Sequence, residues 1–253
     1  MPKVSIITVT YNCRELLKNT IDCISDQSYR DIEHIIIDGN SNDGTVEVIL
    51  SNKNKISYWV SEPDNGIYDA MNKGLKAAKG DYILFLNAGD TFYDVNTLNN
   101  IQFTKYPLAD IFYGETMMVD QNGNQLGLRR KKLPYDLSWQ HFKQGMVVCH
   151  QSVFVKREIA PPFDLKYRYA ADIEWVLCSL KNSKQVIFTN SIISNFVEGG
   201  FSNQNLVKSW IERFIILKVH FGLFQSIISH FSFFIDRLFV IFNIIPLYRK
   251  IKL

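Results

Sequence analysis

Three aspartates stand where a carboxylate could take part in chemistry: Asp38, Asp90 and Asp172. Asp38 and Asp90 each follow an apolar run, in HIIID and LFLNAGD, and Asp172 opens a predicted helix in YAADIEW. A carboxylate after a strand can accept hydrogen bonds from a base or ribose, or hold Mg²⁺ or Mn²⁺ beside phosphates. One at a helix start can remove a proton from a hydroxyl. The alternatives are a turn for Asp38, a loop cap for Asp90 and a helix N-cap for Asp172.

Four other polar sites near these runs are candidates for a functional or a structural role. His150 follows an apolar run and is either a core histidine or a contact to a second substrate, the reading that we favour slightly. Glu174, two residues beyond Asp172, points away from it on a helix. Asp43 is predicted to cap a helix. The basic run 129–132 predicts a solvated face, with a phosphate or lipid-headgroup contact as the alternative.

Strands and helices alternate along the first half of the chain. Apolar, β-branched runs predict strands at 4–9, 32–37, 56–60 and 82–86, and helical spacing predicts helices at 14–25, 44–50 and 67–78. This alternation is typical of an α/β fold with a mostly parallel sheet whose strands are buried on both faces. Ligands bind such sheets beyond the carboxyl ends of the strands. Tyr11, Asp38 and the segment 87–90 are therefore expected at one edge.

The second half of the chain is less regular. We expect strands at 111–119, 147–155 and 185–189, a helix at 172–180, a loop at 199–202 and a helix at 206–221, followed by a Phe-rich segment at 221–247. This organisation predicts a catalytic α/β domain at 1–204 and a helical C-terminal region at 205–253.

Composition narrows the class of protein. The chain has 253 residues, enough for one large domain and an appendage, and its net charge of +3 gives no indication of nucleic acid as a partner. Its four cysteines form no C-x-x-C pair, which predicts reduced thiols and a cytoplasmic location. The N-terminal sequence does not have the pattern of a signal peptide.

The C-terminal region differs in charge and hydrophobicity from the rest. Residues 205–253 carry seven basic and two acidic residues, whereas the remainder of the chain has a net charge near −2. Residues 221–235 are mainly apolar and rich in Phe, and Asp236-Arg237 then interrupts them. This pattern favours a helix lying in a membrane surface, on the cytoplasmic side, over one that crosses it. The alternative is a helical hairpin packed on the catalytic domain or a second subunit.

Taken together, these motifs resemble the family 2 glycosyltransferases with a GT-A fold. The likeness covers about the first 200 residues and runs in order through VSIITVTYN, HIIIDGNSNDGT, SEPDNGIYDAMNKGLKAAKGDYILFLNAGD, CHQSVFV, AADIEW and GGFS. Each motif alone is weak, but their order and spacing are specific. The sequence is most similar to the branch found in bacterial exopolysaccharide and O-antigen clusters, including the colanic acid glycosyltransferases.

The resemblance implies a role for each matching residue. Thr10, Tyr11, Asp38, Asp64 and Asn87 would contact a nucleotide-diphosphate sugar donor, with a UDP-sugar favoured. Asp90 would hold Mn²⁺ or Mg²⁺ as the remaining acid of the metal-binding DXD element, and Asp172 would be the catalytic base. Gly200 and Ser202 would belong to a loop at 199–202 that closes over the donor, and His150 is the residue that we expect to touch the acceptor. The acceptor would be a saccharide or lipid-linked saccharide of a cell-surface polysaccharide pathway.

Two departures from the family pattern matter. The family usually reads D-x-D-D where this chain has Asn87-Ala88-Gly89-Asp90, so metal affinity should fall and strict metal dependence is left open. The Q-x-x-R-W element of processive synthases is absent, which favours transfer of one sugar per acceptor over polymerisation. The expected reaction is a single in-line displacement, which inverts the anomeric configuration. Two alternatives remain: a non-catalytic nucleotide-sugar-binding scaffold, and a sugar-nucleotide pyrophosphorylase, which the lack of glycine in SIITVTYN disfavours.

Overall fold

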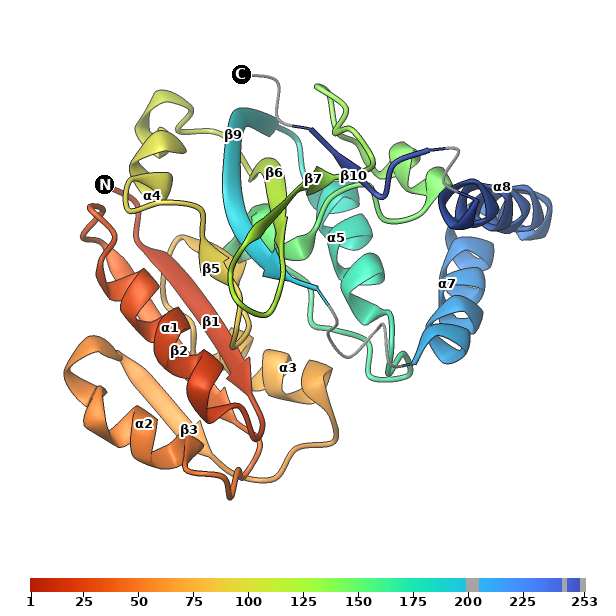
Figure 1. Cartoon of the computed structure of the whole chain (residues 1–253). Helices are drawn as coiled ribbons and strands as arrows, with labels where there is room; N and C mark the ends of the chain where they lie inside the picture. Colours follow the sequence, from red (N-terminus) through yellow and green to blue (C-terminus); the bar gives the residue numbers. More distant parts are fainter. Residues whose placement is uncertain (199–204, 243–244, 251–253) are drawn as a thin grey trace.

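The computed structural model describes residues 1–198, 205–242 and 245–250, and it places a large mixed sheet at the centre of the molecule (Figure 1). The N-terminal half of the sheet is parallel, in the order β4-β1-β2-β3. Its strands are β1 (Val4–Thr10), β2 (Ile32–Asp38), β3 (Tyr58–Ser61) and β4 (Tyr82–Phe85). The predicted α/β fold with alternating strands and helices is confirmed.

The C-terminal half extends the same sheet with mostly antiparallel pairs. β8 (Val153–Lys156) pairs with β4, and β6 (Ile111–Val119) lies between β8 and β7 (Gln125–Arg129). β9 (Val186–Val197) runs parallel to β6 and pairs with the short β5 (Thr91–Phe92). The strand expected at 185–189 is therefore longer than predicted.

One predicted strand is wrong in its first part. The strand expected at 147–155 begins only at Val153, because residues His150–Ser152 form a 3₁₀ turn. This turn directs His150 toward Asp172 and Gln151 toward Asp90 instead of adding them to the sheet. An apolar run can therefore be buried without being a strand, and periodicity alone does not distinguish the two.

Helices cover both faces of the sheet. α1 (Arg14–Ser25), α2 (Thr45–Ser51) and α4 (Thr97–Asn100) supply buried residues to one side, and α3 (Ile67–Ala77) and α5 (Ala171–Asn182) to the other. Alternate residues of β1 enter different clusters: Ile7 packs with the α3–α5 side, and Ile6 with the opposite side. α3 lies close to β1, since a Cβ added at Gly74 would be 2.3 Å from Ile7 Cγ2.

Two long helices lie at the edge of the molecule: α7 (Leu206–Phe221) packs beside α5, and α8 (Leu223–Ile241) packs on α7 (Figure 1). One side of α8 meets the rest of the protein, where Ser229 Oγ donates to the Lys143 carbonyl oxygen. By length and composition α8 could also cross a membrane. After α8 the chain returns to the sheet as β10 (Tyr248–Arg249), and Arg249 Nη2 donates to both Glu115 carboxylate oxygens at 2.7 Å.

Candidate active site

The carboxyl ends of β1, β2 and β4 meet at one edge of the sheet, as predicted. Thr10 and Asp38 are direct partners in the β1–β2 ladder. The Ala88 N–H donates to the Val9 carbonyl at 3.2 Å, which brings the loop after β4 alongside the end of β1. Residues from three separate stretches of sequence therefore surround one edge, which is where ligands bind in open α/β sheets.

Asp38 is fully buried at this edge, and its carboxylate is occupied by the chain itself. Oδ2 accepts hydrogen bonds from the Ser41 N–H at 3.0 Å and the Ser61 hydroxyl at 2.6 Å, and Oδ1 accepts from the Ser41 hydroxyl. These bonds form the turn that was one of the two readings of Asp38. Ser41 and Ser61 were not identified from the sequence, because nothing in their local pattern relates them to Asp38.

Tyr11 and Asp64 flank Gly39, directly after Asp38. A Cβ added at Gly39 would lie 2.7 Å from Asp64 Oδ2 and 3.3 Å from Tyr11 Cδ2, so the two side chains approach the backbone of Gly39 from different loops. Tyr11 is 65% exposed, and Asp64 Oδ1 accepts a hydrogen bond from the Gly66 N–H at 2.8 Å. An open aromatic ring beside a carboxylate can stack on a base and accept hydrogen bonds from a nucleoside.

Asp90 is buried between two segments that are distant in sequence. Its Oδ2 accepts a hydrogen bond from Gln151 Nε2 at 3.0 Å, and its Oδ1 accepts one from the Val197 N–H at 3.2 Å. Burial raises the pKa of Asp90 to about 6, and the bonds from Gln151 and Val197 oppose this rise. Gln151 is a further residue of the site that its sequence pattern did not indicate.

The residues around Asp90 fit a divalent cation only as a partial ligand set. Asn87 lies in the same loop as Asp90. Its Oδ1 and the hydroxyl oxygen of Thr10 are both buried and have no hydrogen-bond partner among the described residues. Asp90 and Asn87 can each offer an oxygen, the ligand atom that Mg²⁺ and Mn²⁺ prefer. With one carboxylate, the site depends on phosphate oxygens and water for its remaining ligands.

Asp172 lies inside the first turn of α5 and does not cap it, since the cap residue is Ala170. Its Oδ1 accepts a hydrogen bond from the Tyr68 hydroxyl at 3.1 Å, and its Oδ2 lies 3.4 Å from His150 Nδ1. Burial alone would raise the pKa of Asp172, but the hydrogen bond and charge of His150, followed by the charge of Arg213 and the Tyr68 bond, lower it below its ordinary value. The group is therefore a half-buried, ionised carboxylate, with 18% of its side chain exposed, held by two partners.

The segment directly before α5 is also held by α7. The carboxylate of Glu212 accepts hydrogen bonds from the N–H groups of Arg168, Tyr169 and Ala170 at 2.7–2.9 Å. These are the backbone donors that immediately precede the helix bearing Asp172. Glu212 therefore links the C-terminal region to the predicted base, a role that a glutamate in a helical pattern does not reveal.

Glu174 and Asp43 lie away from the predicted base. Glu174 points away from Asp172 as expected, and its Oε1 lies 3.8 Å from His220 Nε2. Asp43 accepts hydrogen bonds from the Thr45 N–H at 3.0 Å and the Arg14 N–H at 3.1 Å, at the first residues of α2 and α1. Gly200 and Ser202, with the loop predicted at 199–202, lie outside the described residues.

Comparisons with known proteins agree on the class of this chain. Residues 5–160 match the family described as glycosyl transferase family 2. A PGL/p-HBAD biosynthesis glycosyltransferase of Mycobacterium bovis is 30% identical over 222 residues, covering 84% of each chain. An uncharacterized glycosyltransferase of Haemophilus influenzae is 28% identical over 236 residues, covering 90% of this chain and 93% of that protein.

Solved structures share the fold. The S. aureus TarS fragment 1–349 in complex with UDP-GlcNAc superposes with a TM-score of 0.69 at 16% identity, over 91% of this chain and 73% of that one. The mannosyltransferase PcManGT from Pyrobaculum calidifontis, in complex with GDP-Man and Mn²⁺, gives a TM-score of 0.61 at 17% identity, over 90% and 74%. With the family match spanning more than half of its residues, this chain belongs to glycosyl transferase family 2 and is a glycosyltransferase with a GT-A fold.

Proposed function

We propose that this enzyme transfers one sugar from a nucleoside-diphosphate sugar, with a UDP-sugar favoured, to a saccharide or lipid-linked saccharide, with inversion at the anomeric carbon. Asp172 is the observation that carries the proposal. A half-buried carboxylate with a lowered pKa, held by Tyr68 and His150, is ionised at neutral pH and can accept a proton. The donor-side residues Tyr11, Asp64 and Asp90 supply a place for the nucleotide at the strand ends.

The step is a single in-line displacement. The acceptor hydroxyl oxygen bonds to the anomeric carbon while the bond from that carbon to the diphosphate oxygen breaks, and the electron pair of this bond leaves with the nucleoside diphosphate. Asp172 takes the proton of the hydroxyl from the face opposite the leaving group. His150 and Tyr68 orient Asp172 and hold its charge in place before the donor binds.

On the donor side, the ring of Tyr11 stacks on the base and Asp64 accepts hydrogen bonds from the nucleoside. Asp38 acts by shaping the loop with Ser41 and Ser61, because their three donors already occupy its carboxylate. Asp90 and Asn87 would hold Mn²⁺ or Mg²⁺ together with the diphosphate. When bound, the cation neutralises the charge that grows on the leaving phosphate.

The C-terminal helices support peripheral association with the cytoplasmic face of a membrane. On α8 the side chains of Ser226 and Ser229 are buried against the protein, whereas Phe224 and Phe231 are 79% and 67% exposed. The apolar face of α8 thus points to the outside, which suits a helix lying in the lipid interface. Since Asp236 also pairs with Arg130 at 3.0 Å, separating α8 to span a bilayer would break contacts with the catalytic domain.

The proposal is tested by incubating the full-length protein and membranes with a panel of UDP-, GDP- and dTDP-sugars, each with Mn²⁺, with Mg²⁺ or with chelator. Release of nucleoside diphosphate from one donor, lost with chelator, supports both the transfer and the cation at Asp90. Release that continues in the presence of chelator supports the transfer and contradicts the proposed cation at Asp90. If the folded protein turns over no donor when lipid acceptor is present, the proposal is wrong and a non-catalytic binding protein takes its place.

A further inference from the structure

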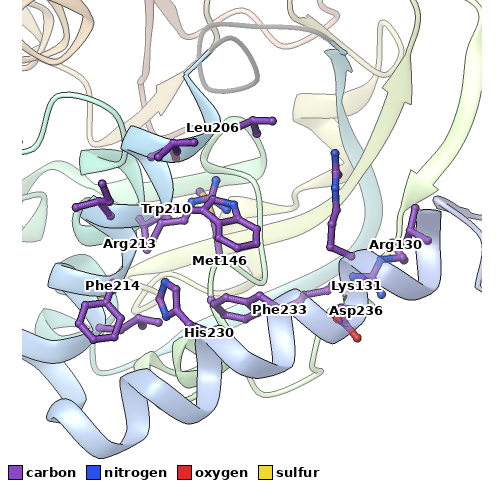
Figure 2. Close-up of a pocket in the computed structure, with 18 of the residues that line it drawn as sticks. Arg130, Lys131, Met146, Leu206, Trp210, Arg213, Phe214, His230, Phe233 and Asp236 are labelled. Atoms are coloured by element: carbon purple, nitrogen blue, oxygen red, sulfur yellow. Dashed lines mark hydrogen bonds and ion pairs between the residues drawn. The ribbon is translucent and has the colours of Figure 1, made fainter. Parts of the chain in front are cut away.

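A cavity of about 760 Å³ lies between α7, α8 and the residues that follow β7 (Figure 2). Its size falls within the range of about 300–1,000 Å³ that is common for small-molecule sites. Figure 2 shows the Trp210 ring in the cavity, with His230 and Phe233 pointing into it from α8. Ile173, the residue after Asp172, also lines it. The side chains of Trp210, His230, Phe233 and Ile173 belong neither to the donor side nor to the partners of Asp172.

The polar lining of this cavity is strongly basic. It includes Arg129, Arg130, Lys131, Arg213 and Arg237, against the acidic residue Asp236. Asp236 pairs with Arg130 at 3.0 Å and so offsets one of these charges. Three of the basic residues come from the run that was expected to form a solvated face. That expectation is wrong for them, because they line a cavity beneath α8.

Two half-buried arginines each have a buried nitrogen without an acceptor among the described residues: Arg129 at Nη1 and Arg213 at Nε. Arg129 uses its Nη2 to bond the Met146 carbonyl at 2.7 Å. Burial and then the charge of Arg129 lower the pKa of Lys131 to about 8, so the positive charges lie close enough to repel one another. An unsatisfied buried donor is costly, and a phosphate oxygen is the acceptor that guanidinium groups match best.

The rest of the lining is apolar and reaches the surface. Phe214, Phe233, Val240 and Leu247 form walls, and Val207 and Ile211 line the cavity while being 74% and 56% exposed. An inorganic anion would leave these walls in water. A phosphate attached to a hydrocarbon chain would satisfy the guanidinium groups and cover the walls at the same time.

We propose that this cavity binds a phosphate or diphosphate group borne on a hydrocarbon chain, with Arg129 and Arg213 as the main phosphate contacts. The inference rests on the proposed function, because it makes the acceptor a phosphate-linked lipid. Ile173 borders the cavity and Asp172 precedes it on α5. Arg213 also lies near enough to Asp172 for their charges to interact. A saccharide joined to the bound phosphate would therefore extend toward the base.

The test is calorimetric titration of the full-length protein with farnesyl phosphate, farnesol and inorganic phosphate. Farnesyl phosphate should bind at least about tenfold more tightly than either other probe, since only it supplies both charge and chain. Arg129→Gln should weaken its binding by about tenfold or more. Arg237→Gln, at an exposed side chain, is a second variant that should keep the fold, and Arg30→Gln, outside the cavity, is the matched control.

Equal affinity for farnesyl phosphate and farnesol, or unchanged affinity in both cavity variants, overturns the inference. UDP, GDP and dTDP are titrated into the same samples. If a nucleotide binds and farnesyl phosphate does not, the cavity is not a lipid-phosphate site, and the proposed function is unaffected. Vesicles of phosphatidylcholine with equal mole fractions of polyprenyl phosphate or phosphatidylglycerol separate the two sources. Preference for polyprenyl phosphate identifies the lipid carrier of the acceptor, and equal binding identifies a membrane headgroup.

Discussion

His150 and Gln151 are consecutive in the chain, yet their side chains hold two different carboxylates. His150 Nδ1 lies 3.4 Å from Asp172 Oδ2, and Gln151 Nε2 donates to Asp90 Oδ2 at 3.0 Å. The short turn His150–Ser152 therefore connects the proposed base to the proposed metal ligand. A movement of this turn would displace both groups, so donor binding and base orientation are linked through two adjacent residues.

Asp172→Asn should reduce transfer by about 10²–10⁴-fold, because an amide cannot accept the proton of the acceptor. Nucleotide affinity should remain near that of the wild type, since Asp172 does not lie among the donor-side residues. Turnover and calorimetric titration of the nucleotide measure the two effects. Glu174→Gln is the matched control on the same helix turn. A near-normal rate in Asp172→Asn would remove Asp172 as the base.

His150→Ala should move the acidic limb of the pH–rate profile to higher pH. Burial alone would raise the pKa of Asp172, and the hydrogen bond and charge of His150 are the largest effects that lower it. Without them the base is protonated at a higher pH and loses activity there. His150→Gln, whose amide can still donate a hydrogen bond, should shift the limb less. Profiles of kcat/KM that superimpose for all three proteins would show that His150 does not act through Asp172.

Asp90→Asn should remove a pH-dependent part of the stability. Burial raises the pKa of Asp90 from 3.8 to about 6, so between these values the unfolded chain has released a proton that the folded protein still holds. As pH rises from about 4 to above 6, the ionisation of Asp90 should therefore lower the free energy of unfolding of the wild type by about 2–3 kcal/mol. Asn does not titrate. Urea unfolding of both proteins at several pH values measures the difference, and a constant offset would contradict the raised pKa.

Glu212→Gln should lower stability by about 1–3 kcal/mol, because a neutral amide with one oxygen cannot replace a carboxylate that accepts three backbone hydrogen bonds. The loosened start of α5 should also reduce kcat while nucleotide affinity is kept. Thermal unfolding and steady-state kinetics measure both. Glu47→Gln, on the exposed side of α2, is the control. If Glu212→Gln loses stability but keeps its kcat, Glu212 supports the fold without positioning Asp172.

The double variant Phe224→Ser/Phe231→Ser should leave membranes without unfolding. Both rings are exposed on the outer face of α8. Each substitution should therefore weaken lipid binding by about 1.5–3 kcal/mol and change the free energy of unfolding little. Flotation with phosphatidylcholine–phosphatidylglycerol vesicles measures the partition. Leu108→Ser, at a side chain 80% exposed outside α7 and α8, is the control. Unchanged partitioning would show that α8 does not bind lipid.

Much of the fold could be predicted because its signals are local. The helix α1 spans Arg14–Ser25 as expected, and β1 and β2 each extend one residue beyond their predicted ends. Apolar periodicity records which face of an element is buried, so it does not require knowledge of the partner. The strand prediction for 147–155 was wrong in its first part for the same reason, because a buried apolar run has the same pattern whether it forms a strand or a turn.

The sequence by itself determined the parallel α/β half, the edge that gathers Tyr11, Asp38 and Asp90, and the position of Asp172 in the first turn of a helix. Only the tertiary structure decided their environments. It joined Tyr68 to Asp172 across 104 residues and Gln151 to Asp90 across 61, and it enclosed Arg129 and Arg213 beneath α8. Local pattern specifies that a carboxylate stands at the end of a strand or the start of a helix. Its pKa and partners depend on burial and on long-range contacts, which exist only when distant elements pack together.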